Sequence, residues 1–173
     1  MAASWLRRLA LGPDADEFWK HYQKYHAARS RAARLYHSWR CQRICCLRGA
    51  SIPVRTKILG RITFPHGMAG VFISQDAVIG EGCVIFQQVT IGSNTLPDAK
   101  RPGSPSVGRN VYIGAGAKVI GGVTVGDGCR IGANCVVFED LPADSTAVLP
   151  KPRVISHDAP MDNRFIPKNA RKS

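Results

Sequence analysis

The chain has 173 residues, of which 45% are hydrophobic, so it is long enough for one domain with a buried core and a small appendage. No apolar run is long enough to span a bilayer, and the first residues lack the sustained apolar stretch of a secretory signal, which predicts a cytoplasmic protein. The net charge of +12 is large and favours anionic partners over cationic ones.

The positive charge is concentrated in one region of the sequence. Between Glu17 and Asp76 there is no acidic residue, but eleven basic ones occur: Lys20, Lys24, Arg29, Arg31, Arg34, Arg40, Arg43, Arg48, Arg55, Lys57 and Arg61. Such a region attracts nucleic acid, a membrane surface or a phosphorylated small molecule, or is only a solvated face. No recognised nucleic-acid motif accompanies it, which argues against nucleic acid. Peripheral association with an anionic membrane remains an open alternative.

The first part of the chain predicts helices. Pro13 and Asp14, followed by Glu17, resemble a helix start with a capping box. Apolar and aromatic residues then recur at helical spacing: Phe18, Tyr22, Tyr25, Ala32, Tyr36 and Trp39. We therefore predict one or two amphipathic helices over residues 14–48, ended by Gly49, with the aromatic stripe in the core.

From residue 73 onward the sequence has a period of six. Ten repeats begin with Ile or Val: Ile73, Ile79, Ile85, Ile91, Val107, Ile113, Val119, Val125, Ile131 and Val137. A weaker phase at Ile52, Ile58 and Phe64 breaks at residues 66–70, and residues 93–106 interrupt the period after Ile91. Short strands that turn a corner every six residues stack coil upon coil, which predicts a parallel β-helix that begins near residue 52.

Two other positions of the repeat support this interpretation. The second is glycine in six repeats, which suits a sharp corner where φ is positive or the backbone is crowded: Gly80, Gly92, Gly108, Gly114, Gly126 and Gly132. The fifth should point inward with the first, because alternate side chains of a strand share a face. It is apolar or cysteine in nine of ten repeats: Ala77, Cys83, Val89, Thr95, Val111, Ala117, Val123, Cys129, Cys135 and Leu141.

The same pattern decides against two alternatives. The glycines near residues 114–122 are not followed by an amphipathic helix, so a doubly wound dinucleotide-binding fold is excluded. The six cysteines form no Cys-x-x-Cys pair, so we expect no metal site, and Cys83, Cys129 and Cys135 are interpreted as small buried hydrophobic residues.

Several short motifs between residues 52 and 155 carry a family resemblance. Val89-Thr90-Ile91-Gly92 matches V-T-L-G, residues 113–118 read I-G-A-G-A-K, residues 131–134 match I-G-A-G, and residues 141–142 and 150–154 match C-terminal motifs. The sequence thus resembles serine acetyltransferases and their relatives that acetylate surface polysaccharides. The resemblance implies a mainly β fold, a left-handed parallel β-helix of hexapeptide repeats with a short N-terminal α-helical segment. It also implies acetyl-CoA as co-substrate and a homotrimer with active sites between subunits.

The catalytic prediction rests on one histidine. Acetyl transfer to a hydroxyl needs a base, and a histidine suits that role at neutral pH. His66 lies at the break in the coil, in a segment that matches the D-H-A-T-G of the family, and we predict it as the general base. Two residues depart from the family: Pro65 replaces the aspartate before this histidine, and Ser104 stands where the serine enzymes have a second histidine.

Further site residues come from the insertion and from the resemblance. A loop that interrupts a strict repeat tends to line a binding face, so the insertion predicts an active-site flap. Within it, Lys100, Arg101 and Ser104 are predicted to bind the substrate, or the two cations to bind the phosphates of CoA. The resemblance places five residues at coenzyme-binding positions, of which the two arginines are alternatively plain solvated charges: Gly92, Ala115, Arg130, Ala133 and Arg153.

The two departures and the basic region favour a sugar hydroxyl of a surface polysaccharide or its precursor as acceptor, for an enzyme at the inner membrane surface. Two alternatives stay open: a serine O-acetyltransferase of cysteine biosynthesis with a small-molecule acceptor, and a non-catalytic β-helix that acts as a scaffold or binds anions. We predict a helical segment over residues 1–50, the β-helix acyltransferase domain over 51–155 and a basic C-terminal tail over 156–173.

Overall fold

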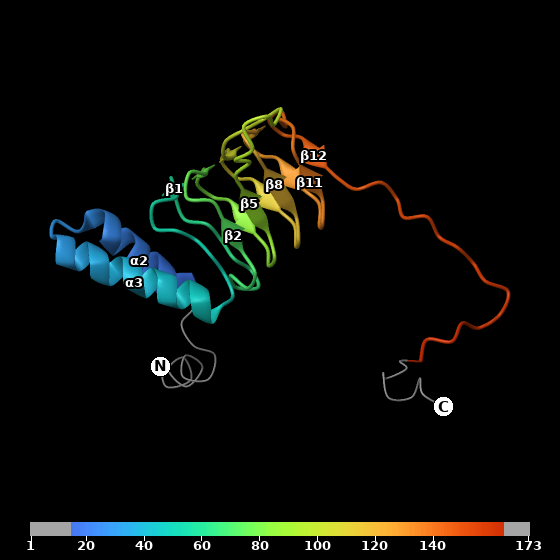
Figure 1. The fold of residues 1–173 in the computed structure, drawn as a ribbon, viewed down its shortest axis with the longest axis horizontal. Helices are drawn as coiled ribbons and strands as arrows, with labels where there is room; N and C mark the ends of the chain where they lie inside the picture. The colour runs from blue at the N-terminus through green and yellow to red at the C-terminus, as the bar shows by residue number, and fades with distance from the viewer. Residues whose placement is uncertain (1–14, 165–173) are drawn as a thin grey trace.

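The computed structural model describes residues 15–164, so the capping box predicted at Pro13 and Asp14 and the end of the C-terminal tail lie outside the described residues. Two helices, α2 (Ala15–Ala27) and α3 (Arg31–Leu47), precede a stack of short strands (Figure 1). The strands are β1 (Lys57–Ile58), β2 (Phe72–Ile73), β3 (Val78–Ile79), β4 (Val84–Ile85), β5 (Thr90–Gly92), β6 (Ser106–Val107), β7 (Tyr112–Ile113), β8 (Lys118–Ile120), β9 (Thr124–Val125), β10 (Arg130–Ile131), β11 (Val136–Val137) and β12 (Thr146–Ala147).

The helices α2 and α3 lie side by side and form what we call the helical hairpin, residues 15–47 (Figure 1). Ser30 caps α3, because its hydroxyl accepts a hydrogen bond from the backbone N–H of Ala33 at 3.1 Å. Gly49 follows the helix with φ +59°, a conformation that favours glycine, and the next N–H returns to the carbonyl of Cys45. The predicted helical region thus consists of two helices, and Gly49 lies just past their end.

The helical hairpin docks on the first coil of the strand stack through α2. The indole N–H of Trp19 donates to the carbonyl of Ile62 at 3.2 Å. The hydroxyl of Tyr22 donates to the carbonyl of Thr56 at 2.7 Å and accepts from the N–H of Ile58 at 3.2 Å. The aromatic residues of α2 therefore cover the open end of the stack and satisfy backbone groups there.

The strands form three parallel sheets, one on each side of a triangular coil. Sheet A contains β2, β5, β8 and β11; sheet B contains β1, β3, β6 and β9; sheet C contains β4, β7, β10 and β12. Between regular coils, paired residues are 18 positions apart in sequence, as in Ile113 with Ile131, which is three hexapeptides. The first coil is longer, since Lys57 pairs with Val78, and the last is shorter, since Arg130 pairs with Thr146. Pairs that bridge the insertion are 28 apart, as in Ile91 with Val119. The insertion therefore adds ten residues to one coil, and the spacing of 18 resumes after it.

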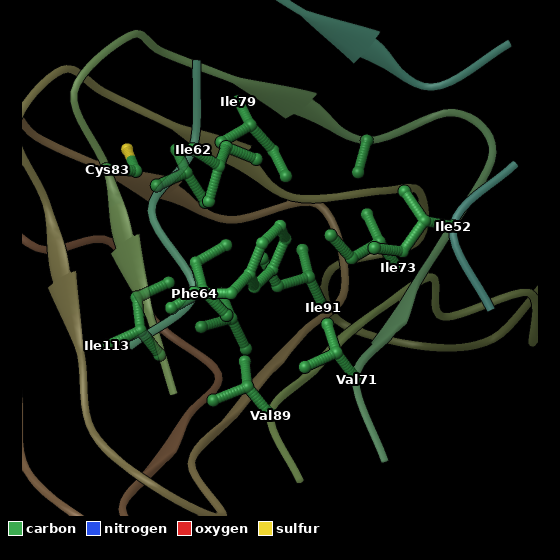
Figure 2. Packing of buried hydrophobic residues seen from close by; sticks show 14 of the residues in the cluster. Ile52, Ile62, Phe64, Val71, Ile73, Ile79, Cys83, Val89, Ile91 and Ile113 are labelled. Carbon is green, nitrogen blue, oxygen red and sulfur yellow. The ribbon is translucent and has the colours of Figure 1, made fainter. Parts of the chain in front are cut away.

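The first position of every repeat from Ile73 to Val137 is buried. Figure 2 shows Ile73, Ile79, Ile91 and other buried side chains around Phe64, whose ring lies among them in the core. Of the fifth positions, Cys83, Cys129 and Cys135 are buried, as predicted. Thr95 is a correction: it lies in the insertion and is exposed, and Pro105 occupies the buried inward position of that repeat.

The second and fourth positions of the hexapeptide favour glycine for different reasons. Gly80, at a second position, has ordinary φ, but a Cβ there would lie 2.4 Å from the carbonyl oxygen of Gly108 on the next coil. Crowding between coils, rather than positive φ, thus selects glycine at this position. Positive φ occurs instead two residues later, at the fourth position, for example at Gly82 and Asn110.

Candidate functional site

His66 lies at the corner between sheet C and sheet A. Thr63 forms a bridge to Val84 of sheet C, and the chain re-enters a sheet at Phe72 in β2 of sheet A. In between, the turns at Gly67 and Gly70, with φ of +75° and +66°, replace the regular hexapeptide corner. The break in the repeat therefore places an exposed imidazole on the outside of a rigid coil.

Gln87 orients the imidazole of His66. Its Oε1 lies 3.0 Å from Nδ1 of His66, on the equivalent corner of the next coil. A carbonyl oxygen only accepts, so Nδ1 carries the proton and Nε2 keeps its lone pair. This tautomer is the one that a general base needs, with Nε2 free to accept a proton. Sequence reasoning missed Gln87, although it occupies the same corner of the next coil.

Two aromatic rings support the same corner. Phe86 contacts His66 edge to face, with ring centroids 5.3 Å apart and planes at 85°. Tyr112 of β7 contacts Phe86 in turn, at 5.1 Å between centroids. The three rings make a ladder along consecutive coils, so the imidazole has an apolar wall on one side and the Gln87 amide as a hydrogen-bond partner.

The corner beside Gln87 holds a backbone conformation that is unusual for its residue. Gln88 has φ +61°, at a position where other repeats have glycine, asparagine or aspartate. The ammonium of Lys118 donates to the carbonyl of Gln88 at 2.9 Å and to that of Gly116 at 3.0 Å. Such strained positions cluster at functional sites. A long side chain at this fourth position was the feature in the sequence that could have indicated the site.

The insertion lies at a different corner, between sheet A and sheet B. Asn94 and Gly103 bridge its two arms, each N–H bonding the other residue's carbonyl at 2.8 Å. At its base, the hydroxyl of Ser104 lies 2.6 Å from that of Ser93, which lies 2.5 Å from that of Ser74. Ser104, which stands at the position of the second histidine in the family resemblance, is therefore part of a chain of three hydroxyls.

The insertion is fixed to the neighbouring coil. Arg101 forms an ion pair with Asp140 at 2.8 Å. Hydrogen bonds from the backbone N–H of Thr124 and from Arg101 lower the pKa of Asp140, so the carboxylate that holds the loop stays ionised. The returning arm of the insertion packs on Gly122, where a Cβ would lie 2.4 Å from the carbonyl oxygen of Pro102. Lys100 and Arg101 line a pocket of about 220 Å³ here, together with Phe138.

The remaining predicted residues fall into separate places. Ala115 and Ala133 lie on consecutive coils at the same corner as His66, and the N–H of Asn134 bonds the carbonyl of Ala115 at 2.8 Å. Arg130 lies on the outer face of sheet C, and Arg153 is exposed beyond β12. Gly92 ends β5 at the corner of the insertion. Within one chain, the predicted residues near His66 and those at the insertion therefore lie at different corners.

The other features that the sequence singled out lie away from this corner. His21 and His37 face each other within the helical hairpin, and His26 contacts the carbonyl of Val54 at 3.0 Å. Within residues 15–164, no group of three or more His, Cys, Asp or Glu side chains has the arrangement of a metal site. Neither described helix is long and apolar enough to cross a bilayer.

Comparison with known proteins identifies the repeat and the relatives. Residues 104–139 match the family model of the bacterial transferase hexapeptide (six repeats). A serine acetyltransferase of Synechococcus elongatus is 38% identical over 125 residues, which are 70% of this chain and 50% of that protein. A serine acetyltransferase of Helicobacter pylori is 44% identical over 110 residues, 64% of this chain and 63% of that protein. The chain thus spans half to under two thirds of the length of these relatives.

The fold is similar to that of solved serine acetyltransferases. The crystal structure of serine acetyltransferase isoform 3 of Entamoeba histolytica, in complex with cysteine, superimposes with a TM-score of 0.60 at 35% identity. The match covers 71% of this chain and 43% of that one. It confirms the predicted fold class, a left-handed parallel β-helix after a short helical segment.

These relatives overturn the prediction of a polysaccharide hydroxyl as the acceptor, because they are serine acetyltransferases. The structure explains why the prediction was wrong. Replacement of the aspartate by Pro65 does not leave His66 without an orienting partner, since Gln87 takes that role. Eight of the eleven basic residues lie between Lys20 and Arg48, in or next to the helical hairpin, and are not a property of the corner that carries the histidine.

The repeat register, the matched family model and the superposition agree with one another. The chain therefore carries hexapeptide repeats and is similar to serine acetyltransferases in both sequence and fold.

Proposed function

We propose that the protein transfers the acetyl group of acetyl-CoA to the hydroxyl of serine, with His66 as the general base. The hydrogen bond from Nδ1 of His66 to Gln87 Oε1, at 3.0 Å, is the observation that carries this proposal. It leaves Nε2 as the proton acceptor on an exposed corner. The similarity to serine acetyltransferases supports serine as the acceptor.

In the proposed reaction, His66 accepts one proton and later returns it. As the serine oxygen forms its bond to the acetyl carbon, Nε2 takes the hydroxyl proton. When the carbon–sulfur bond of the thioester breaks, the imidazolium returns this proton to the departing thiolate of CoA. Gln87 holds the ring in one orientation throughout, and its carbonyl dipole stabilises the positive charge that forms on the ring.

Coenzyme binding is proposed for Gly92, Ala115, Arg130, Ala133 and Arg153. The small side chains of Ala115 and Ala133 leave room along the corner below His66, and Arg130 supplies a cation beside them. Lys100, Arg101 and Ser104 are proposed to contact the substrates from the insertion. The pocket at the insertion, about 220 Å³, is smaller than a typical ligand pocket, so a coenzyme would extend well beyond it.

A homotrimer would complete such a site. The corner with His66 lies between sheets C and A, and the corner with Ser104 lies between sheets A and B. In a ring with threefold symmetry, the first corner of one copy meets the second corner of the next, because heterologous contacts of this kind close on themselves. We therefore propose that residues 51–155 form the acyltransferase domain, flanked by a helical segment and a basic tail, and act as a trimer.

The first experiment measures thiol release from acetyl-CoA in the presence of L-serine and identifies O-acetylserine by mass spectrometry. His66→Ala should lower kcat by about 10²–10⁴-fold, the usual contribution of general acid–base catalysis, and leave the KM for acetyl-CoA near its original value. A scaffold without catalysis would release no thiol, and release without acetylserine would remove serine as the acceptor.

The second experiment tests Gln87 as a positioning residue. Gln87→Leu removes one neutral hydrogen bond, so kcat should fall by about tenfold while substrate KM values change little. Gln87→Glu keeps an acceptor and adds a charge, so it should recover kcat and move the acidic limb of the pH profile to higher pH. Gln23→Leu, at an exposed glutamine of α2 away from both corners, is the matched control. Equal effects of the Gln23 and Gln87 changes would contradict the positioning role.

A further inference from the structure

A second concave site lies outside the acetyl-transfer corner, within the helical hairpin. A cleft of about 530 Å³ is lined by side chains of both α2 and α3. We call it the hairpin cleft; its basic and aromatic lining consists of Lys20, His21 and Lys24 of α2 and Tyr36, His37 and Arg40 of α3. Its existence is independent of the proposed acetyl transfer.

The charges in the hairpin cleft leave an excess of cations. Two carboxylates also line it, but Asp16 pairs with Arg61 of the first coil, and Glu17 pairs with Arg40. In the part of the chain that the structure describes, Lys20 and Lys24 have no ion-pair partner. They are one helical turn apart on the same face of α2, so both ammonium groups can reach one small anion.

Arg40 shows an unsatisfied donor in the same place. Its Nε is buried and has no hydrogen-bond acceptor among residues 15–164, although its terminal nitrogen bonds Glu17. Buried donors are nearly always satisfied, so this Nε–H is available to an acceptor that enters the cleft. The Nε–H of Arg40 and the ammonium groups of Lys20 and Lys24 are all hydrogen-bond donors. A small oxyanion only accepts hydrogen bonds, so it is the complementary ligand.

Two histidines form the floor of the cleft. Nδ1 of His21 lies 2.9 Å from Nδ1 of His37. A contact of this kind requires one protonated and one unprotonated Nδ1, so the pair accepts one additional proton without losing the hydrogen bond. Burial, then the charge of Arg40 and the proximity of His37, lower the pKa of His21, while Glu17 opposes them. Desolvation and the positive charges around His21 therefore favour its neutral form.

We propose that the hairpin cleft binds a small oxyanion, a sulfate or the phosphate group of a small molecule, and that binding promotes protonation of the His21–His37 pair. The anion lies between Lys20, Lys24 and Arg40 and cancels the cationic field that opposes protonation. The effect is reciprocal by thermodynamic linkage. If the bound anion favours proton uptake, then a lower pH must increase the affinity for the anion.

Sulfate is the probe of choice, because it keeps two negative charges over the whole range in which histidine titrates. Isothermal titration of the full chain with sodium sulfate, at constant ionic strength set with chloride, should give one saturable site per chain. The affinity should rise as the pH falls from about 8 to about 6, across the titration range of histidine. Inorganic phosphate and glycerol 3-phosphate, as second and third titrants, compare the free ion with a phosphomonoester.

Paired variants separate a site from diffuse attraction. Lys20→Gln/Lys24→Gln should weaken sulfate by about tenfold or more, as expected when hydrogen bonds to a charged group are removed. Arg29→Gln/Arg31→Gln removes the same charge from the exposed hairpin turn and the start of α3 and should change the affinity by less than about twofold. His37→Gln should keep the affinity at high pH and gain little on acidification.

Three results would overturn the proposal: no saturable sulfate binding, equal losses in the two double variants, or a wild-type affinity that does not depend on pH. Vesicles of phosphatidylcholine with and without phosphatidic acid distinguish the source of the phosphate. Binding to acidic vesicles that the Lys20→Gln/Lys24→Gln change abolishes would assign the cleft to a lipid headgroup. Binding of the free ions alone would assign it to a soluble anion.

Discussion

The β-helix and the helical hairpin bury apolar side chains in different ways. In the β-helix, Ile113 lies between Ile85 and Ile131, its equivalents on the coils before and after, and the same contact recurs along the whole stack. In the hairpin, the contacts of Phe18, Trp19 and Tyr22 with one another and with the first coil occur only once. Repetition makes the register of the β-helix insensitive to any single residue, whereas the hairpin depends on particular pairs.

This difference separates the chemistry of the two regions as well. The β-helix interior holds mainly aliphatic residues and cysteines, and the imidazole of His66 lies at a break in the repeat. The hairpin places polar and titratable groups in and next to its own packing, including the His21–His37 pair and the Glu17–Arg40 ion pair. We therefore expect damage to the β-helix to appear as lost stability, and damage to the hairpin to depend on pH and ions as well.

Thiol reactivity should differ most strongly within the helical hairpin, between the exposed Cys46 and the buried thiols beside it, whereas every cysteine of the β-helix is buried. Burial raises the pKa of Cys41 to about 12 and that of Cys45 to about 11, whereas Cys46, next to them, is exposed. At about pH 8, an ordinary thiol with a pKa near 8.5 is about a thousandfold more ionised than Cys41. Brief treatment with iodoacetamide should therefore label Cys46 alone, as read by peptide mass spectrometry. Comparable labelling of Cys83, Cys129 or Cys135 would mean that the coils open readily.

A cavity in the middle of the β-helix should cost the most stability. Ile113→Ala removes three buried carbons at a position with no exposed surface, and unfolding free energy should fall by about 2–5 kcal/mol. Denaturant titration followed by circular dichroism measures the change. Leu35→Ala on the exposed side of α3 is the control and should stay within about 0.5 kcal/mol of the wild type. Similar losses in both variants would contradict the assignment of the core.

The junction of the two regions should respond to the loss of one hydroxyl. Tyr22→Phe leaves the carbonyl of Thr56 and the N–H of Ile58 without their partner, which should cost about 1–3 kcal/mol. Hydrogen exchange should then increase in α2 and α3 and remain slow in β7 and β10. Tyr25→Phe, which removes a hydroxyl that makes no hydrogen bond in residues 15–164, is the matched control. Uniformly faster exchange throughout the chain would mean that the hairpin and the coils unfold as one unit.

The fold was predictable from the sequence because the same pattern of inward-facing residues occurs in ten repeats. A period of six with Ile or Val at the first position fixes which side chains point inward, and the burial of Ile73 and its equivalents confirms it. The break that isolates His66 was visible for the same reason. Thr95 was misplaced, because an insertion leaves no periodic mark of where the inward position resumes, and Pro105 takes it.

The partners of the candidate site were not predictable, since they lie on neighbouring coils. Gln87 meets His66 only because the coils stack in register, and no local pattern marks a glutamine as the partner of a histidine 21 residues away. The sequence therefore showed Pro65 as a lost orienting group without showing its replacement. The His21–His37 pair was hidden in the same way, because it depends on how α2 and α3 face each other.

The smallest expected effect is a pH dependence confined to the hairpin. Because the pKa of His21 is lowered in the folded protein, the unfolded chain binds more protons near pH 6.5, and stability should fall as the pH drops through about that value. The carboxyls of Asp127 and Asp140, whose pKa values are also lowered, take up protons only below this range.

Thermal unfolding in chloride buffer between about pH 8 and pH 5.5 should show this loss of stability. His37→Gln should reduce the loss, since one cause of the pKa shift of His21 is removed. Added sulfate should restore the lost stability at low pH more than at high pH, because the anion binds more tightly where the pair is protonated. A melting temperature that is equally sensitive to pH in the wild type and in His37→Gln would place the titrating group elsewhere.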